Sequence, residues 1–328
     1  SNRNNQSSTS TIAFLSSSAT ATSPTSTTSA STPHVQQDDD AGSYLARCVQ
    51  AVGFTTKTFP PTLPPSIREM YRLLLESSLR CLVSNHSMHN GLRTQVIFLF
   101  HRMVACLGEH LVPYLPTTLP PLISTTTAKN AVETFQLVNQ LLLKYPRTMS
   151  SVVNRLALPM ITQLFTLMPS CTPRTSPLQS PTDDQLLSES LQRVFVLFLQ
   201  NVVMNQMSAV FCTPAALPYL GQILQALLRA CSNVPDPNVA KSTFVVLKNL
   251  TEQFLGGGQN GTNGQEGNAL ENYNKMIPNE AKMMLRNLLL NEGTSVMMST
   301  CVRCGYDPGD AAMTLSMHKE VVGLQKGK

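Results

Sequence analysis

Tryptophan is absent from this 328-residue chain, aromatic residues make up 6% of it, and charged residues make up 13%. Proteins that read single-stranded nucleic acid stack bases on aromatic rings beside basic residues. Here Phe98, Phe100 and Phe195 lie on apolar stripes instead, which argues against base stacking. No apolar run approaches the roughly 18 residues that a membrane-spanning helix needs, so no contact with a membrane is predicted.

Catalytic motifs are also absent from the sequence. A nucleophile elbow, a phosphate-binding glycine loop, a zinc-protease helix and paired carboxylates do not occur in a fitting context. We therefore predict no enzymatic activity and no cofactor. The eight cysteines have no regular spacing, which is typical of reduced, buried thiols in an intracellular protein. Cys301 and Cys304 form a CxxC pair, but no second pair nearby completes a tetrahedral zinc site, so no metal is predicted.

Both ends of the chain differ in composition from its middle. Residues 1–37 are mostly Ser, Thr, Ala, Asn and Gln, which bury too little apolar surface to offset their chain entropy. We predict a disordered segment over residues 1–40, and because the first residue is Ser rather than Met, we expect a fragment or an incomplete gene product. The stretch GGGQNGTNGQEGN at 256–268 is a flexible linker, and residues 256–328 are expected to form this linker and a divergent tail.

Between residues 41 and 255, apolar residues recur at three- and four-residue spacing, which predicts amphipathic helices. The helices come in antiparallel pairs that repeat at about forty to fifty residues, the period of HEAT or armadillo arrays. The predicted fold class is all-α: a HEAT-repeat superhelix of stacked antiparallel helix pairs, with a disordered N-terminal segment and loops. The expected helices cover residues 41–57, 66–83, 91–107, 109–124, 128–145, 150–168, 185–205, 214–232 and 236–255.

One polar strip runs along the otherwise apolar helix expected at 91–107. With about 100° per residue, Gln95, Arg102 and Glu109 fall close to one line, and Arg93 lies about 180° from Arg102. A helix in a stacked solenoid is buried on three sides and exposed along one strip. The second helices of the later pairs have the same layout. The basic residues of these strips, which we predict to bind nucleic acid on a concave face, are Arg102, Lys129, Arg193, Lys241 and Lys248.

Ordinary solvated helix faces are the alternative explanation for these strips. The charge distribution favours an acidic partner: residues 41–255 contain 16 Lys and Arg against 9 Asp and Glu, whereas the whole chain has a net charge of +5. Without aromatic platforms, the mode of nucleic-acid binding that remains is recognition of phosphates and of the shape of a folded RNA.

Several segments of the chain resemble the exportin-T family, the tRNA-exporting member of the importin-β superfamily. Their order and spacing are similar to the carboxy-terminal part of that family over about residues 38–258, and the similarity ends after Gly258. These segments are LARCVQAVGFTTKTF (45–59), LRTQVIFLFHRMVACLGEHLVPYLP (92–116), FQLVNQLLLKYP (135–146), QRVFVLFLQNVVMNQMSAVF (192–211) and VPDPNVAKSTFVVLKNLTEQFLGG (234–257).

The resemblance implies an export receptor that binds mature tRNA in the nucleus together with Ran-GTP and releases it in the cytoplasm. The implied partners are tRNA, Ran-GTP and nuclear pore proteins, and the implied localisation is shuttling between nucleus and cytoplasm. In this family the amino-terminal repeats, which are not in this chain, carry most of the Ran contact, so Ran-GTP is expected to bind mainly through them. Two alternatives stay open: a HEAT-repeat karyopherin adaptor that binds protein cargo, and a fragment that binds nothing well alone.

Overall fold

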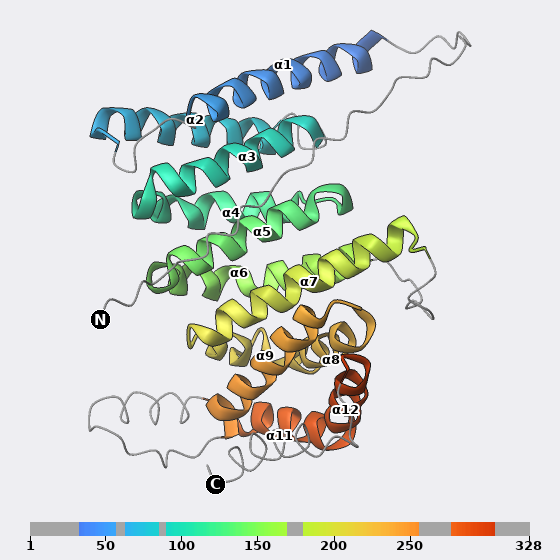
Figure 1. The fold of residues 1–328 in the computed structure, drawn as a ribbon. Helices are drawn as coiled ribbons and strands as arrows, with labels where there is room; N and C mark the ends of the chain where they lie inside the picture. Colours follow the sequence, from blue (N-terminus) through green and yellow to red (C-terminus); the bar gives the residue numbers. More distant parts are fainter. Residues whose placement is uncertain (1–32, 57–62, 85–89, 169–179, 256–276, 306–328) are drawn as a thin grey trace, which may run out of the picture.

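The computed structural model describes residues 33–56, 63–84, 90–168, 180–255 and 277–305. Regular structure in these residues is entirely helical, and the helices stack as antiparallel pairs (Figure 1). The predicted all-α HEAT-repeat superhelix is therefore confirmed. Residues 1–32, most of the proline-rich loop expected at 169–184 and the glycine linker at 256–268 lie outside the described residues.

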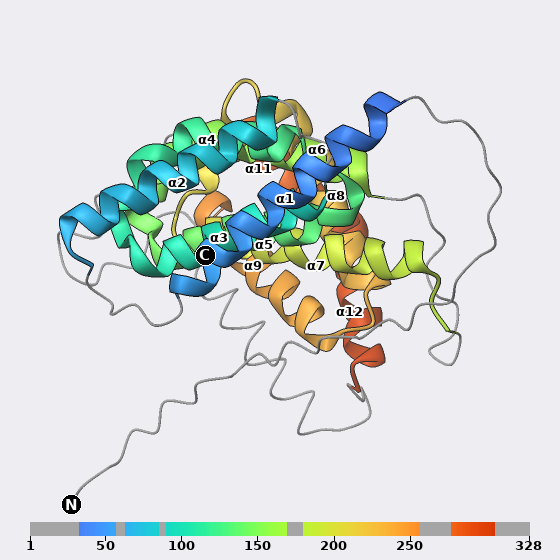
Figure 2. The ribbon, with the colours of Figure 1, turned by 90° about the horizontal axis from the view of Figure 1, so that it is seen from above.

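The helices form two layers, which are seen from two directions in Figures 1 and 2. Helices of the same layer run in the same direction, opposite to that of the other layer. The odd layer consists of α1 (Pro33–Thr55), α3 (Asn90–Cys106), α5 (Ala128–Lys144), α7 (Asp183–Met204) and α9 (Pro237–Leu255). The even layer consists of α2 (Pro65–Ser84), α4 (Leu115–Ser124), α6 (Pro146–Leu167) and α8 (Leu217–Asn233), with the 3₁₀ helices η2 (Gly108–Tyr114) and η3 (Ser208–Cys212) before α4 and α8.

Helix ends follow the backbone preferences of particular residues. Gly108, with φ +60°, turns the chain after α3 in the left-handed region that glycine enters freely. Pro146 opens α6, where its missing N–H is not needed. Thr182 caps α7: its hydroxyl accepts a hydrogen bond from the Gln185 amide at 3.3 Å, and Gln185 Oε1 accepts one from the Thr182 amide at 3.0 Å.

The amino-terminal boundary of the array differs from the prediction. Helix α1 begins at Pro33, whereas residues 1–40 were expected to be disordered. Ala46 and Val49 are buried in the core, so the later part of α1 is held by packing. Once such a helix exists, each residue added at its end gains a backbone hydrogen bond without a new nucleation step, which explains the polar extension.

The carboxy-terminal boundary also differs. Helix α11 (Asn279–Leu288), the π-helical turn η4 (Leu289–Gly293) and α12 (Thr294–Arg303) follow the linker, and α11 and α12 both pack against α8. Ala281 and Leu285 are fully buried. Residues 279–303 thus extend the array, where a divergent tail was expected. No helix was expected in this region, because the stripe that Ala281 and Leu285 contribute is short and becomes evident only through its packing against α8.

One continuous hydrophobic core lies between the two layers and reaches from Ala46 of α1 to Leu285 of α11. Aromatic residues bridge the layers; Phe165 of α6 and Phe195 of α7, for example, have ring centroids 5.5 Å apart. In the described part of the chain, none of the helices combines the length and the apolar character needed to cross a bilayer.

Candidate nucleic-acid interface

The second helices of the predicted pairs form one continuous surface, because α3, α5, α7 and α9 are consecutive members of the odd layer. Neighbouring helices of this layer contact each other directly along the stack, whereas α6 and α8 of the even layer are linked mainly through η3. A stack that is more closely packed on one side curves toward that side. The geometry therefore favours the odd layer as the concave side.

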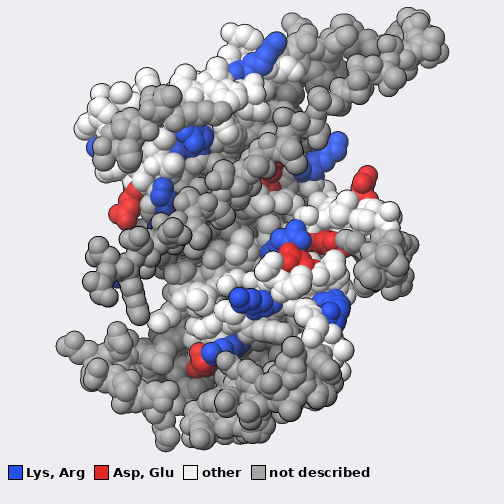
Figure 3. Space-filling model, in the orientation of Figure 1, with Lys and Arg blue, Asp and Glu red and all other residues white. Residues whose placement is uncertain are grey.

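All five predicted cations lie on the odd layer. Lys129, Arg193, Lys241 and Lys248 are exposed, whereas Arg102 is half-buried. Figure 3 shows Lys and Arg side chains distributed along this face from one end of the stack to the other, with a few acidic side chains among them. The exposed acidic residues of these helices are Asp183, Asp184 and Glu252, so the positive charge is interrupted and not continuous.

Three of the five cations are available to a ligand. Lys129 on α5 and Lys241 and Lys248 on α9 have no polar partner in the part of the chain that the structure describes. An ammonium group in this state keeps its full hydration and its flexibility, so it can approach an anion without first breaking an ion pair. These three lysines form the core of the candidate interface.

Arg193 is exposed but forms an ion pair with Asp236. Its Nε atom lies 3.2 Å from Oδ2 of Asp236, and the two side chains are 50% and 26% exposed. Oδ1 of Asp236 accepts a hydrogen bond from the Asn238 amide at 2.9 Å, so this carboxylate also caps the start of α9. An exposed ion pair stabilises a protein by about 0–1 kcal/mol. A phosphate can thus displace the pair, but the fixed carboxylate reduces the attraction at this point.

Arg102 does not have the free, weakly packed position that the strip predicted. Its Nη2 donates to the carbonyl oxygen of Thr56 at 2.9 Å, and its Nε donates to the Thr56 hydroxyl at 3.2 Å. A cation at the carboxy-terminal end of a helix also interacts favourably with the helix dipole. Arg102 therefore joins α3 to the end of α1, and its replacement would disturb the fold as well as any ligand contact.

His101, the neighbour of Arg102, is half-buried and hydrogen-bonded through Nδ1 to Oε1 of Gln140 on α5. Burial lowers the pKa of this imidazole, and the bond to Gln140 opposes the change only in part. Because the ordinary pKa is about 6.5, the ring is neutral at pH 7. His101 therefore adds no positive charge to the interface.

Arg93 lies away from the strip, as the helical wheel predicted, but it is buried, with 1% of its surface exposed. Its Nη1 donates to the Thr125 hydroxyl and its Nη2 to the Thr126 hydroxyl, each at 2.7 Å, and Nη2 also donates to the Leu122 carbonyl. Burial lowers the pKa of this guanidinium to about 10, so it stays charged at neutral pH. Arg93 therefore ties α3 to the end of α4 and has a structural role.

The structure adds a cation that the sequence pattern missed. Arg47 is exposed on α1, the first helix of the odd layer, and has no polar partner among the described residues. The predicted basic strips lie on the second helix of each pair, and α1 precedes the first pair. The packing of α1 against α3 could have been expected from the same helical periodicity.

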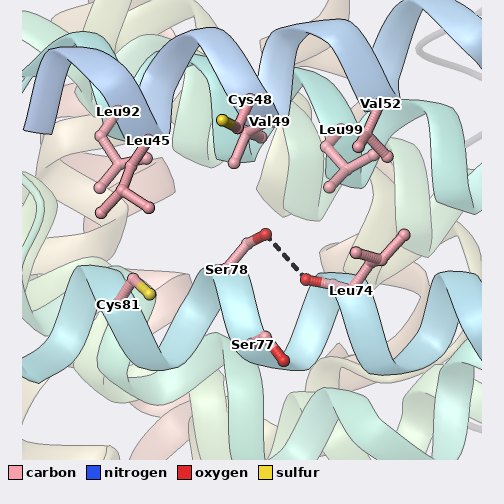
Figure 4. A pocket seen from close by; sticks show the side chains of 10 residues that line it. All are labelled: Leu45, Cys48, Val49, Val52, Leu74, Ser77, Ser78, Cys81, Leu92 and Leu99. Carbon is pink, nitrogen blue, oxygen red and sulfur yellow. Dashed lines mark hydrogen bonds between the residues drawn. The ribbon is translucent and has the colours of Figure 1, made fainter.

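An apolar cavity of about 190 Å³ lies between α1, α2 and α3. Figure 4 shows side chains of α1 and α2 pointing into the gap, with Ser78 turned to donate a hydrogen bond to the Leu74 carbonyl at 2.7 Å. Its lining is almost entirely apolar, so it lacks the converging polar groups of a catalytic site. In the described residues, groups of three or more His, Cys, Asp or Glu side chains that could hold a metal ion do not occur.

The sequence matches the family model of Exportin-T over residues 25–327. The chain belongs to the exportin-T family. It is 27% identical to Exportin-T of Homo sapiens over 235 residues, which cover 69% of this chain and 23% of the human protein. It is 28% identical to Exportin-T of Mus musculus over 240 residues, with coverages of 69% and 23%, and 27% identical to that of Arabidopsis thaliana over 190 residues, with coverages of 58% and 19%.

The chain thus spans less than a quarter of the length of these curated relatives. The family match continues through α11 and α12, beyond Gly258, where the similarity read from the sequence had ended. Both helices also pack against α8, so this part of the chain is folded onto the array.

Proposed function

We propose that this chain is the carboxy-terminal part of a nuclear export receptor for tRNA, and that its odd layer holds tRNA phosphates. The observation that carries the proposal is a set of exposed lysines on one layer of an exportin-T family array that have no polar partner among the described residues: Lys129, Lys241 and Lys248. Arg193 and Arg47 add further charge, and Arg102 acts mainly through the fold. In the complete receptor, transport depends on Ran-GTP and nuclear pore proteins, the protein shuttles between nucleus and cytoplasm, and no reaction is catalysed.

Lysine chemistry fits a carrier that accepts many tRNA sequences. An ammonium group contacts phosphate oxygens and fixes the position of the RNA without reading its bases. Folded RNA is recognised largely by shape and backbone, for which a curved helical wall is suited. The described face offers no exposed pair of aromatic rings beside these lysines, so the contacts are electrostatic.

A salt series with a charge-matched control tests this proposal. Each phosphate contact releases condensed counterions, so replacing Lys129, Lys241 and Lys248 together by Gln should weaken tRNA binding and reduce the log–log salt slope by about two units. The control replaces Arg147 and Arg155 of α6 and Arg229 of α8 by Gln. These are also three exposed cations, but they lie on the even layer, so this variant has the same net charge.

Filter binding of a radiolabelled tRNA over a range of salt concentrations gives both the affinity and the slope. Circular dichroism of both variants checks that the helices are retained. The proposal requires the lysine variant to lose affinity and the arginine variant to keep it. If both variants lost affinity equally, the binding would depend only on net charge, and the proposed interface would be wrong.

A further inference from the structure

Large apolar side chains are exposed on the same layer as the lysines. Leu143 of α5 is 74% exposed, and Leu197 and Met204 of α7 are 41% and 56% exposed. On the even layer, the described exposed large apolar side chains are Met70 and Leu73 of α2 and Tyr219 of α8, with none on α4 and α6. Single exposed apolar residues are common in folded proteins. A group on one surface is informative only if its members are neighbours.

Hydrogen bonds between α5 and α7 show that they are neighbours. Asn139 Nδ2 donates to the Val194 carbonyl at 3.1 Å, and Asn201 Nδ2 donates to Asn139 Oδ1 at 3.3 Å. Asn139 therefore lies at a level between residues 194 and 201 of the parallel neighbouring helix. Leu143 follows one turn later, which places it at a level between Leu197 and Met204.

Contacts between α7 and α9 show which lysines lie level with Leu197 and Met204 of α7. Asn249 Nδ2 lies 3.6 Å from the sulfur of Met204, so Lys248, the preceding residue, is at about the level of Met204 on the neighbouring helix. Leu197 and Lys241 each lie seven residues earlier on their parallel helices. Seven residues are two turns of a helix, about 10 Å, so the arrangement repeats as a second apolar and basic pair.

We propose that Leu143, Leu197, Met204, Lys241 and Lys248, here called the apolar–basic seam, form a docking site for an amphipathic, acidic helix of a partner protein. The apolar side chains of the seam lie beside its lysines, and an amphipathic helix has the complementary pattern. Its apolar residues at i, i+3 or i+4, and i+7 lie along one face, next to a polar flank. Its apolar face covers Leu143, Leu197 and Met204, and carboxylates on its flank meet Lys241 and Lys248. A purely apolar helix would leave the two lysines without an anion, and a basic helix would be repelled by them.

The seam shares Lys241 and Lys248 with the interface proposed for tRNA. It follows that the partner helix and tRNA exclude each other, so the partner would promote the release of tRNA. This second step rests on the proposed function, whereas docking of the helix does not. The two can therefore be tested separately.

A synthetic peptide of about 18 residues, with Leu along one helical face and Glu on both flanks, serves as the probe. Its fluorescence anisotropy is measured with the full chain. The double variant Leu197→Gln/Met204→Gln should weaken binding by about tenfold, since central apolar contacts dominate such interfaces. The matched control, Met70→Gln/Leu73→Gln on α2, removes a Met and a Leu that are each 49% exposed on the even layer, and it should bind the peptide like the parent.

Charge is tested with a second peptide in which every Glu is replaced by Lys. The proposal predicts that this peptide binds at least about tenfold more weakly, because it opposes Lys241 and Lys248. Equal binding of both peptides, no binding of the acidic peptide, or an equal loss in the α2 control would overturn the seam.

Competition with tRNA completes the test. Unlabelled tRNA should displace the acidic peptide, and Leu197→Gln/Met204→Gln should still bind tRNA. If the peptide binds at the seam and tRNA binds without displacing it, the seam stands and mutual exclusion is wrong. If tRNA does not bind at all, the function proposed above fails, while peptide binding still decides the seam.

Discussion

At the scale of single residues, the two arginines of α3 show what a helical wheel can and cannot reveal. The wheel correctly separated Arg93 from Arg102. It did not show that each guanidinium meets the carboxy-terminal end of another helix, Arg93 at Leu122 of α4 and Arg102 at Thr56 after α1. A wheel gives the direction of a side chain, whereas the carbonyl that receives it is set by packing between helices.

When Arg93 is replaced, the loss in the free energy of unfolding is expected to depend more on the side-chain volume removed than on the hydrogen bonds removed. Arg93 Nε has no partner among the described residues, and the hydroxyls of Thr125 and Thr126 also donate to carbonyls of α4, both at 2.8 Å. Arg93→Met keeps most of the volume and should destabilise the chain by less than about 1.5 kcal/mol. Arg93→Ala leaves a cavity and should cost about 3 kcal/mol.

Urea unfolding of both variants measures these two changes in the free energy of unfolding. Arg155→Ala on the exposed side of α6 is the control and should change stability by less than about 0.5 kcal/mol. If Arg93→Met were as damaging as Arg93→Ala, the charged hydrogen bonds would be the dominant contribution and the volume argument would be wrong.

At the scale of helices, side chains of one helix donate hydrogen bonds to the carbonyl groups at the end of its neighbour. Arg102 donates to a carbonyl at the end of α1, the Tyr145 hydroxyl donates to one in the last turn of α3 at 2.6 Å, and Gln253 donates to one in the last turn of α7 at 2.9 Å. The last carbonyls of a helix have no partner inside the helix. A side chain from the next odd helix satisfies them and fixes the register of the stack.

Side-chain hydrogen bonds to carbonyls at a helix end also attach the terminal helix α12. Arg303 donates to the carbonyls of Cys231, Ser232 and Val234 at the end of α8, and the thiol of the buried Cys231 lies 3.5 Å from the Thr300 hydroxyl of α12. Arg303→Gln should therefore release α12 part of the time and expose Cys231. We expect the labelling rate of Cys231 by a thiol reagent to rise several-fold, because local opening controls access to a buried thiol.

Mass spectrometry of the labelled peptides separates Cys231 from the other cysteines. Arg286→Gln on the exposed side of α11 removes the same charge nearby and serves as the control, with labelling expected to match the parent. An unchanged rate for Arg303→Gln would mean that apolar packing alone holds α12.

Helix positions were largely predictable from the sequence, because each packed helix has an apolar stripe of its own. The segments expected at 66–83 and 128–145 correspond to α2 and α5 within about one residue at each end. No helix was predicted where such a pattern is weak: at the polar start of α1, and in the short α11 and α12 beyond a glycine-rich stretch. There the structure depends on contacts with other helices, which a local pattern does not contain.

At the scale of the whole molecule, the array has one continuous core, but each helix packs mainly on the helices next to it in the stack. Each odd helix packs on the odd helices beside it, and α3, α5, α7 and α9 also pack on one or two even helices. The basic face was predictable because solenoid stacking repeats the same exposed strip on every second helix. Which cations are free was not predictable, since the ion pair of Arg193 and the bonds of Arg102 join helices from different repeats.

Local contacts predict that damage to the core stays local. Phe195 of α7 is buried against Phe165 of α6, so Phe195→Ala should cost about 3–5 kcal/mol. In a stack of nearest neighbours, this loss should raise hydrogen exchange in α5–α9 and leave α1 and α2 near the parent rate. Leu197→Ala, two residues along the same helix but 41% exposed, is the control and should leave exchange almost unchanged. Exchange that rose equally from α1 to α9 would instead show that the continuous core makes the array one cooperative unit, in which a ligand bound at the lysines of α9 stabilises even the first helix.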